Sequence, residues 1–365
     1  MSTAKRYCVV VGTRPEIIKT ASVIKELQRR SLDFVIVHSS QHYDRELSGI
    51  FFEELGLPPP GESLHVGSAS PVRQVSSTMA RLENVLERLS PQVILAQGDT
   101  NTALAASLTA NKMGILLGHI EAGLRSHDYR MPEEHNRMVA DHLADLLFAP
   151  TDETAENLKR EGCRGAVHVT GNTVIDACCE FSAISEKNAK VRNSLSLSAY
   201  ALVTLHRAEN VDNPRTLLDL VEILTRCPIP VVWPVHPRAR ARMESTGILE
   251  KFGRSSHVHL ISPVGYIDFL DLMKHSSFIL TDSGGIQEEA TAPVIAKKVF
   301  VLRESTERPE AVKAGFAEIV GTGPNHVINR ISLHLQHPWI APRLTPFGDG
   351  AAGYRIVAQC EKEIS

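Results

Sequence analysis

The sequence predicts an α/β protein built from two doubly wound, Rossmann-like parallel sheets. Short apolar runs that are typical of buried parallel strands recur along the 365 residues, with helical patterns between them. This alternation of strand and helix starts again after about residue 176. At 43% hydrophobic and 22% charged residues, the composition excludes disordered and fibrous classes and allows two domains with separate cores.

The first half opens with a strand, a turn and a helix. Residues 6–11 favour a strand, residues 12–15 are turn formers, and apolar side chains recur at helical spacing over 17–27. Thr13 and Glu16 have the spacing of a capping box. Further strands are expected at 34–37, 93–96, 115–117, 146–149 and 166–169.

The clearest helix of this half begins at Ser70 and Pro71, which we expect as its cap and first residue. The second half repeats the alternation, and residues 95–100 and 279–284 each place an acid and a hydroxyl where a strand gives way to a helix. Strands of this half are expected at 200–205, 230–233, 258–261, 278–281 and 299–302. We expect an N-terminal domain of residues 1–172 and a C-terminal domain of residues 173–348.

Charge and composition argue against several partners. The chain has 39 Lys and Arg against 42 Asp and Glu, a net charge of −3, so it lacks the basic footprint of nucleic-acid binders. No apolar stretch reaches the roughly 18 residues of a membrane span. The six cysteines are scattered without zinc-site spacing. We expect a cytoplasmic protein with reduced cysteines that binds no nucleic acid, membrane or metal.

Groups suited to anions follow predicted strands, where open α/β sheets bind ligands. Arg14 and Lys19 lie beside a helix N-terminus after the first strand, although an ordinary turn with a surface arginine would look the same. Ser283, Gly284 and Gly285 open a helix in the second half, and paired glycines let the backbone approach a diphosphate. Neither segment is a GxGxxG or Walker A loop, so no dinucleotide cofactor is expected.

Candidate acids and bases of the first half are Asp99, Glu121 and Glu133, which follow strands or open a helix. Carboxylates gathered in one site could titrate apart and perform general acid/base catalysis. By itself, Glu133 could instead stabilise its helix, because an acid after Pro132 is common there and Arg137 lies four residues on.

Two histidines of the second half, His206 and His236, follow strands and lie beside Arg207 and Arg238. Each could donate to a phosphate, although a lone histidine is more often a structural hydrogen bonder.

Taken in order, these segments and several others resemble the UDP-N-acetylglucosamine 2-epimerases over nearly the whole chain. The matching motifs are residues 12–16 (GTRPE), 41–44 (QHYD), 98–100 (GDT), 119–125 (HIEAGLR), 131–137 (MPEEHNR), 170–173 (TGNT), 206–210 (HRAEN), 281–289 (TDSGGIQEE) and 306–310 (TERPE).

The resemblance implies a GT-B type fold with the active site between two Rossmann-like domains, a homodimer, and a final helix in 349–365 that returns to the first domain. It implies Asp99, Glu121 and Glu133 as catalytic acids and bases and His206 as the group facing the leaving UDP. Substrate-binding residues are then Arg14, Lys19, Phe269, Ser283, Gly284, Gly285, Glu289 and Arg308, with Phe269 beside the uracil and Glu289 at the ribose. Gln41, Arg207 and His236 resemble parts of a second, activating UDP-sugar site.

The chemistry of the substrate favours the same arrangement. The C2 hydrogen of a UDP-sugar is not next to a carbonyl, so epimerisation needs either oxidation by nicotinamide or elimination of UDP to a 2-acetamidoglucal. The missing dinucleotide fingerprint favours elimination, with no cofactor.

Several alternative functions are compatible with these residues. They are a 2-epimerase of a related sugar such as UDP-2,3-diacetamido-glucuronic acid, a hydrolysing epimerase that releases N-acetylmannosamine, a glycosyltransferase, and a sensor that binds a UDP-sugar without turnover.

Overall fold

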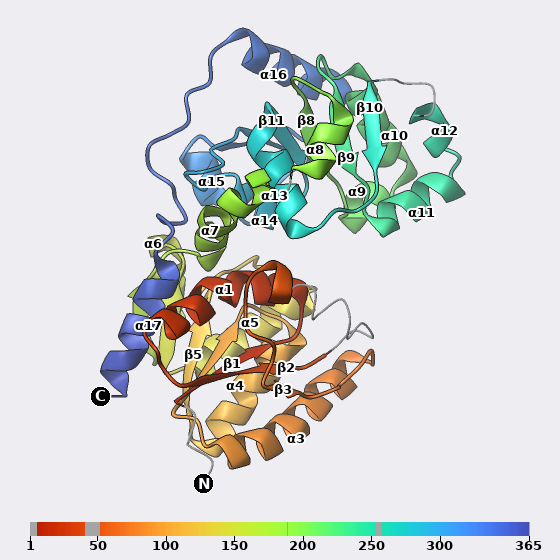
Figure 1. The fold of residues 1–365 in the computed structure, drawn as a ribbon. Coiled ribbons are helices and arrows are strands. Elements are labelled where there is room, and N and C mark those ends of the chain that lie inside the picture. Colours follow the sequence, from red (N-terminus) through yellow and green to blue (C-terminus); the bar gives the residue numbers. More distant parts are fainter. Residues whose placement is uncertain (1–5, 41–51, 188, 253–256, 365) are drawn as a thin grey trace. The chain divides into compact units, whose positions relative to one another are not determined.

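The computed structural model describes residues 6–40, 52–187, 189–252 and 257–364 (Figure 1). The chain divides into two compact units. The first consists of Met1–Ala177 together with Phe347–Ser365, and the second of Cys178–Pro346. The division falls within helix α7 (Thr173–Lys187).

The first unit is a doubly wound parallel sheet with strand order β3-β2-β1-β4-β5-β6-β7. Its strands are β1 (Tyr7–Val11), β2 (Phe34–His38), β3 (Glu62–Ser63), β4 (Val93–Gln97), β5 (Leu116–Ile120), β6 (Leu146–Ala149) and β7 (Ala166–Val169). Its helices are α1 (Arg14–Arg29), α3 (Pro71–Leu89), α4 (Asn101–Met113), α5 (Pro132–Leu143), α6 (Asp152–Arg160) and α17 (Ala352–Glu363).

The centre of this sheet is apolar because its strands are covered on both faces. Every residue of β1 is buried, and Val9 pairs with Ile36 of β2 and Leu95 of β4. The strands predicted from apolar runs are confirmed. Strand β3 was not predicted, because two polar residues at the sheet edge leave no apolar run to recognise.

The second unit repeats the architecture with strand order β10-β9-β8-β11-β12-β13, again all parallel. Its strands are β8 (Ala201–Thr204), β9 (Val231–Pro234), β10 (Val258–Ile261), β11 (Phe278–Thr281), β12 (Val299–Val301) and β13 (Ala317–Ile319). Its helices are α8 (Lys190–Leu195), α9 (Ala208–Val211), α10 (Pro214–Arg226), α11 (Pro237–Ser245), α12 (Leu249–Phe252), α13 (Tyr266–His275), α14 (Gly284–Glu289), α15 (Pro309–Lys313) and α16 (Pro324–Gln336). The edge strand β13 was not predicted.

In each sheet the order in which successive strands are added reverses between two neighbouring strands. These are β1 and β4 in the first unit and β8 and β11 in the second. Ligands of doubly wound sheets bind outside the carboxyl ends of the strands at such a point. The two similar segments noted in the sequence contain Asp99, the second residue after β4, and Asp282, the first residue after β11, so each acid follows the corresponding strand of its sheet. The repeat is one of topology as well as of sequence.

The C-terminal helix α17 belongs to the first unit and packs beside α1 (Figure 1). The carboxylate of Asp176 accepts hydrogen bonds from the backbone N–H groups of Ala352 (3.0 Å) and Gly353 (2.7 Å) at the start of α17. A Cβ at Gly353 would lie 2.8 Å from the backbone carbon of Ser22 in α1, so only glycine allows the two helices this close.

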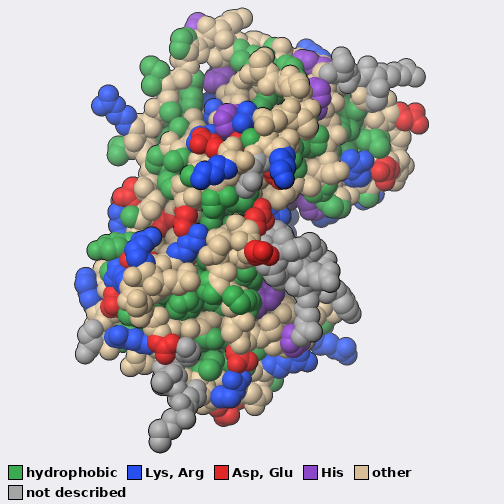
Figure 2. All heavy atoms as spheres, viewed as in Figure 1, with side chains coloured by type: hydrophobic (Ala, Val, Ile, Leu, Met, Phe, Trp, Pro, Cys, Tyr) green, Lys and Arg blue, Asp and Glu red, His purple; other side chains and the backbone are tan. Residues whose placement is uncertain are grey.

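The distribution of charged side chains and the length and polarity of the helices agree with what the composition predicts. On the face shown in Figure 2, basic and acidic side chains are interspersed. Among the residues that the structure describes, no helix is both long and apolar enough to cross a membrane.

Candidate functional site

The turn between β1 and α1 is tied to the loop after β4 by one buried carboxylate. Glu16 accepts hydrogen bonds from the N–H groups of Gly12 (3.1 Å) and Thr13 (2.7 Å) and from the hydroxyl of Thr100 (2.8 Å). The predicted capping box of Thr13 and Glu16 is thus confirmed. Burial raises the pKa of Glu16 to about 7, against the effect of these hydrogen bonds.

Close packing fixes the same turn from its other side. A Cβ at Gly12 would lie 2.1 Å from Oγ1 of Thr102 and 2.5 Å from Oγ of Ser39. Because Gly12 has no side chain, the end of β1 can lie this close to Ser39 and Thr102. Two residues later, the expected anion-binding residue Arg14 is half-buried at the first position of α1.

Glu121 is the most strongly held of the predicted carboxylates. It follows β5 with a φ of +73°, an unfavourable conformation for a residue with a side chain. Its two oxygens lie 2.7 and 2.6 Å from Nζ of Lys19, and Oε2 also accepts a hydrogen bond from the amide of Gln97. The structure thus joins two predicted site residues, Lys19 and Glu121, and adds Gln97, which the sequence did not single out.

Asp99 lies at the end of β4, partly exposed, and forms an ion pair with Arg137 of α5. Arg137 also pairs with Glu134 at 2.8 Å. The alternative pairing considered from sequence, Glu133 with Arg137, is therefore replaced by one with Glu134, three residues before the arginine. Glu133 is exposed in the first turn of α5, next to these residues in the chain.

Glu134 has a structural role that sequence inspection missed. It is fully buried and accepts hydrogen bonds from the N–H groups of Ser126 and His127 and from the Ser126 hydroxyl, at 2.8 to 3.1 Å. Of two successive glutamates, one thus anchors the preceding loop and leaves the other, Glu133, facing solvent.

A second buried network, also missed from sequence, lies beneath the loop of Asp99. The ring of His119 contacts Asp141 through Nδ1 (2.7 Å) and the carbonyl oxygen of Gly98 through Nε2 (2.8 Å). Burial alone would lower the pKa of His119, but Asp141 and the Gly98 carbonyl outweigh it and raise that pKa. Arg125 pairs with the same Asp141 at 2.7 Å, so the carboxylate is shared between Arg125 and His119.

In the second unit, His206 follows β8 and is joined to Asp282, which follows the neighbouring strand β11. Nδ1 of His206 lies 3.1 Å from Oδ1 of Asp282. The N–H groups of His206 and Arg207 also donate to this carboxylate, at 3.0 to 3.2 Å, as does the amide of Asn210 (3.1 Å). From the sequence we expected a role for His206 but none for Asp282, although this acid follows β11 as Asp99 follows β4.

Two of the three residues expected at an activating site, His236 and Arg207, lie in the part of the second unit that the structure describes. The rings of His236 and His206 have centroids 6.0 Å apart. Arg207 forms an ion pair with Glu307 at 3.3 Å. Gln41 lies outside the described residues.

The expected diphosphate residues mark the start of α14, with Ser283 as its N-cap and Gly284 as its first residue. A Cβ on Gly284 would lie 3.8 Å from the guanidinium carbon of Arg308, which brings Arg308 to the same turn. Arg308 forms an ion pair with the buried Glu288, whereas the expected ribose residue, Glu289, is half-buried at the end of α14. The remaining predicted residues are Gly285, half-buried in α14, and Phe269, half-buried in α13.

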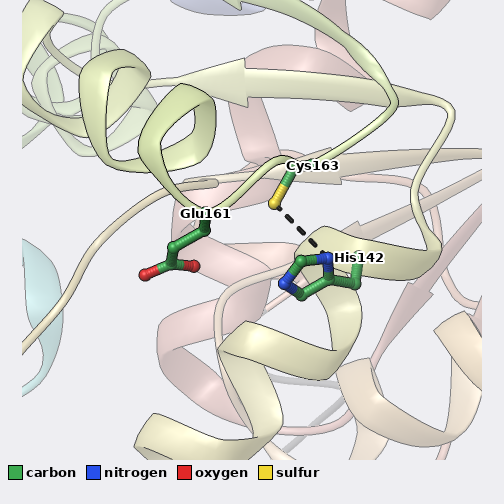
Figure 3. A group of neighbouring side chains, drawn as sticks. All are labelled: His142, Glu161 and Cys163. Atoms are coloured by element: carbon green, nitrogen blue, oxygen red, sulfur yellow. Dashed lines mark hydrogen bonds between the residues drawn. The ribbon is translucent and has the colours of Figure 1, made fainter.

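One group of side chains in the described residues has metal-ligand chemistry: His142, Glu161 and Cys163 in the first unit (Figure 3). Both oxygens of Glu161 are already bonded to the guanidinium of Arg125, at 2.8 and 2.5 Å. Burial raises the pKa of the Cys163 thiol to about 11, which disfavours the thiolate that binds metals. We therefore assign no metal to this group.

Comparison with known proteins extends over nearly the whole chain. The sequence profile of the family described as UDP-N-acetylglucosamine 2-epimerase matches residues 25–361. The UDP-N-acetylglucosamine 2-epimerase of Methanocaldococcus jannaschii is 41% identical over 363 residues, covering 96% of this chain and 98% of the relative. A UDP-2,3-diacetamido-2,3-dideoxy-D-glucuronate 2-epimerase of Pseudomonas aeruginosa is 37% identical over 364 residues, covering 98% of this chain and 99% of the relative.

The fold agrees with the sequence comparison. The crystal structure of the M. jannaschii UDP-GlcNAc 2-epimerase in complex with UDP-GlcNAc and UDP matches with a TM-score of 0.86 at 40% identity, covering 98% of this chain and 99% of that one. The predicted α/β fold of GT-B type, with two Rossmann-like domains, is confirmed. The chain belongs to the UDP-N-acetylglucosamine 2-epimerase family, whose members are carbohydrate epimerases.

Proposed function

We propose that this protein interconverts UDP-N-acetylglucosamine and UDP-N-acetylmannosamine by eliminating UDP to a 2-acetamidoglucal and adding it back. The observation that carries the proposal is the placement of Glu121, a buried carboxylate held by Lys19 and Gln97 at the end of a central strand in a chain of this family. The relative crystallised with UDP-GlcNAc and UDP supports the choice of substrate.

In the proposed reaction, a carboxylate removes the proton from C2, and the electrons of that bond form the C1–C2 double bond. The C1–O bond breaks as this double bond forms, and its electron pair leaves on the β-phosphate oxygen of UDP. Addition of UDP to C1 and of a proton to the opposite face of C2 completes the epimerisation. The net change is redox neutral, so it requires no external oxidant.

Residues of the first unit supply the acids and bases of this reaction. Glu121, Asp99 and Glu133 are the proposed groups, and the different surroundings of Glu121 (buried), Asp99 (partly exposed) and Glu133 (exposed) suit them to different proton transfers. Lys19 compensates the charge of Glu121 while the proton is absent.

The second unit supplies most of the nucleotide contacts in this proposal. His206 donates to the β-phosphate oxygen as negative charge grows on it, which is the stabilisation a departing diphosphate needs. The proposed diphosphate residues are Arg14 of the first unit and, in the second unit, the turn of Ser283, Gly284 and Gly285 with Arg308 beside that turn. Glu289 binds the ribose and Phe269 the uracil.

Three further features belong to the proposal. We assign the protein to the cytoplasm, which its buried thiols Cys8, Cys178, Cys227 and Cys360 support, because reduced cysteines are typical of that compartment. We assign it a homodimeric state, which sedimentation equilibrium tests.

Gln41, Arg207 and His236 contribute to an activating UDP-sugar site, which a sigmoidal dependence of rate on UDP-GlcNAc would reveal.

A related substrate is the second candidate, because the 37% identical relative from P. aeruginosa is a UDP-2,3-diacetamido-2,3-dideoxy-D-glucuronate 2-epimerase. The two substrates differ at C3 and C6. A comparison of kcat/KM for the two UDP-sugars decides between them.

The test is turnover in D₂O followed by proton and phosphorus NMR, with enzyme dialysed against a chelator and no NAD added. Deuterium should appear at C2 of both UDP-GlcNAc and UDP-ManNAc while UDP-sugar is conserved. Accumulation of free UDP and N-acetylmannosamine would assign the hydrolysing reaction. Binding of the UDP-sugar without exchange of the C2 hydrogen would show that the protein is a sensor. Activity that returned solely with NAD or a divalent ion would reject the elimination route.

A further inference from the structure

Asp282 is a fully buried acid with an unusually complete set of donors. Two backbone N–H groups, from His206 and Arg207, and the amide of Asn210 donate to its oxygens. Nδ1 of His206 lies 3.1 Å from Oδ1. Burial alone would raise the pKa of Asp282, but its hydrogen bonds, that of His206 first, hold the pKa below its usual value. The group beside Nδ1 is therefore a carboxylate, which only accepts.

This geometry decides which nitrogen of His206 bears the proton. Because Nδ1 faces a carboxylate, it carries hydrogen, and Nε2 is the ring nitrogen left for another partner. A neutral ring in this tautomer would offer Nε2 as an acceptor only. The ring can donate from Nε2 only as the imidazolium, whose charge Asp282 compensates.

The neighbouring histidine has the opposite arrangement. Nδ1 of His236 accepts the N–H of Arg238 at 3.2 Å, so it bears no proton there. Burial lowers the pKa of His236, and His206 and Arg238 lower it further, with Asp282 acting in the other direction. Arg207, the other cation at this turn, is paired with Glu307 at 3.3 Å. Of the two imidazoles, His206 is the one whose Nδ1 faces a carboxylate.

We propose that Asp282 is a positioning residue that keeps the proton on Nδ1 of His206 and makes the imidazolium the form that donates from Nε2 to the leaving diphosphate. The inference rests on the proposed function for the role of His206. It assigns Asp282 an effect on the reaction that operates through His206, in addition to its bonds to the backbone of residues 206 and 207.

Asp282→Asn provides the kinetic test, because an amide has no charge to compensate the imidazolium and can donate to Nδ1, which leaves His206 a neutral ring and a weaker donor. We expect kcat to fall about 10²-fold or more while the Kd for UDP changes less than threefold. The double variant Asp282→Asn, His206→Ala should be no slower than His206→Ala alone, since both changes remove one interaction. If the two losses multiply, Asp282 only shapes the loop and the proposal is overturned.

Asp271→Asn is the matched control. Asp271 is likewise buried in the second unit beside a histidine, His275 (3.1 Å), and pairs with Arg192 (2.9 Å). It undergoes the same chemical change, so its kcat should stay within about twofold of wild type at temperatures where both variants are folded. A loss equal to that of Asp282→Asn would assign both effects to stability and overturn the proposal.

Nitrogen-15 NMR of the histidine rings separates this inference from the proposed function. In the wild-type protein, Nδ1 of His206 should be protonated, and Asp282→Asn should shift the ring towards the tautomer protonated on Nε2. This NMR signature needs no turnover, so it tests the role of Asp282 even if UDP-GlcNAc is not the substrate. Failure of C2 exchange in wild type would instead reject the proposed epimerase function and leave the tautomer assignment standing. An unprotonated Nδ1 in wild type, or an unchanged ring in the variant, would refute the role of Asp282.

Discussion

Nζ of Lys19 lies 2.7 and 2.6 Å from the two carboxylate oxygens of Glu121, although 102 residues separate them in the chain. Lys19 is in the second turn of α1, after β1, and Glu121 follows β5, on the other side of β4 in the sheet. A largely buried carboxylate is costly without a compensating partner, and Lys19 supplies one together with the amide of Gln97. The pair places a carboxylate and its lysine partner at the carboxyl end of the sheet.

Glu121→Gln should spare UDP binding and reduce kcat by about 10²-fold or more, because the amide has the shape of the carboxylate but cannot take a proton from C2. Steady-state kinetics and UDP calorimetry measure the two effects. Glu83→Gln, an exposed glutamate of α3, is the matched control and should leave both unchanged. Normal turnover by Glu121→Gln would remove this residue from the acid/base assignment.

Arg14→Ala and Ser283→Ala should each weaken UDP binding, since each removes a donor from a proposed phosphate site. A hydrogen bond to a charged group contributes about 1.5 to 3 kcal/mol, so the Kd should rise by roughly one to two orders of magnitude for Arg14. Calorimetry with UDP measures the change. Arg29→Ala, at the opposite end of the same helix, and Ser332→Ala in α16 are the controls, and an equal loss in a control would point to general destabilisation.

His206→Ala should harm cleavage of the C1–O bond more than binding of UDP. Its side chain is 43% exposed, and a donor to the departing phosphate contributes about 2.7 to 4 kcal/mol to the transition state, a loss of about 10² to 10³ in kcat. Exchange of the C2 hydrogen should fall in parallel. His337→Ala, an exposed histidine after α16, should have no effect. A change confined to KM would instead make His206 a binding or activating residue.

The buried Asp176 should make stability depend on pH. Burial raises the pKa of Asp176 from 3.8 to about 6, so the folded state favours the protonated form, and its contribution to stability is lost as the pH rises from about 4 through 6. For this group alone the difference is about 3 kcal/mol.

The measurement is the free energy of unfolding by urea at several pH values, with Asp176→Asn as the variant. The amide still accepts from the start of α17 but does not titrate, so wild type should lose stability relative to the variant between pH 4 and 6. Asp349→Asn, an exposed carboxylate paired with Arg355, is the comparison and should not reproduce that trend. A constant difference between wild type and Asp176→Asn would show that Asp176 stays charged.

Much of the fold could be predicted from the sequence because the signals are local. Apolar runs marked the central strands, and the capping residues Ser70 with Pro71 and Thr13 with Glu16 marked the starts of α3 and α1. The edge strands β3 and β13 escaped notice because they are only two and three residues long, and β3 has no apolar side chain.

By itself, the sequence determined the two Rossmann-like sheets, the family and the residue types available for acid/base and phosphate chemistry. It could not decide which residues meet, because partners are set by strand order and not by distance along the chain. The pairing of Lys19 with Glu121 follows from the neighbouring positions of β1, β4 and β5, and that of His206 with Asp282 from the adjacency of β8 and β11. Long-range contacts between polar side chains leave no periodic pattern in sequence, so only the tertiary structure decided these pairs.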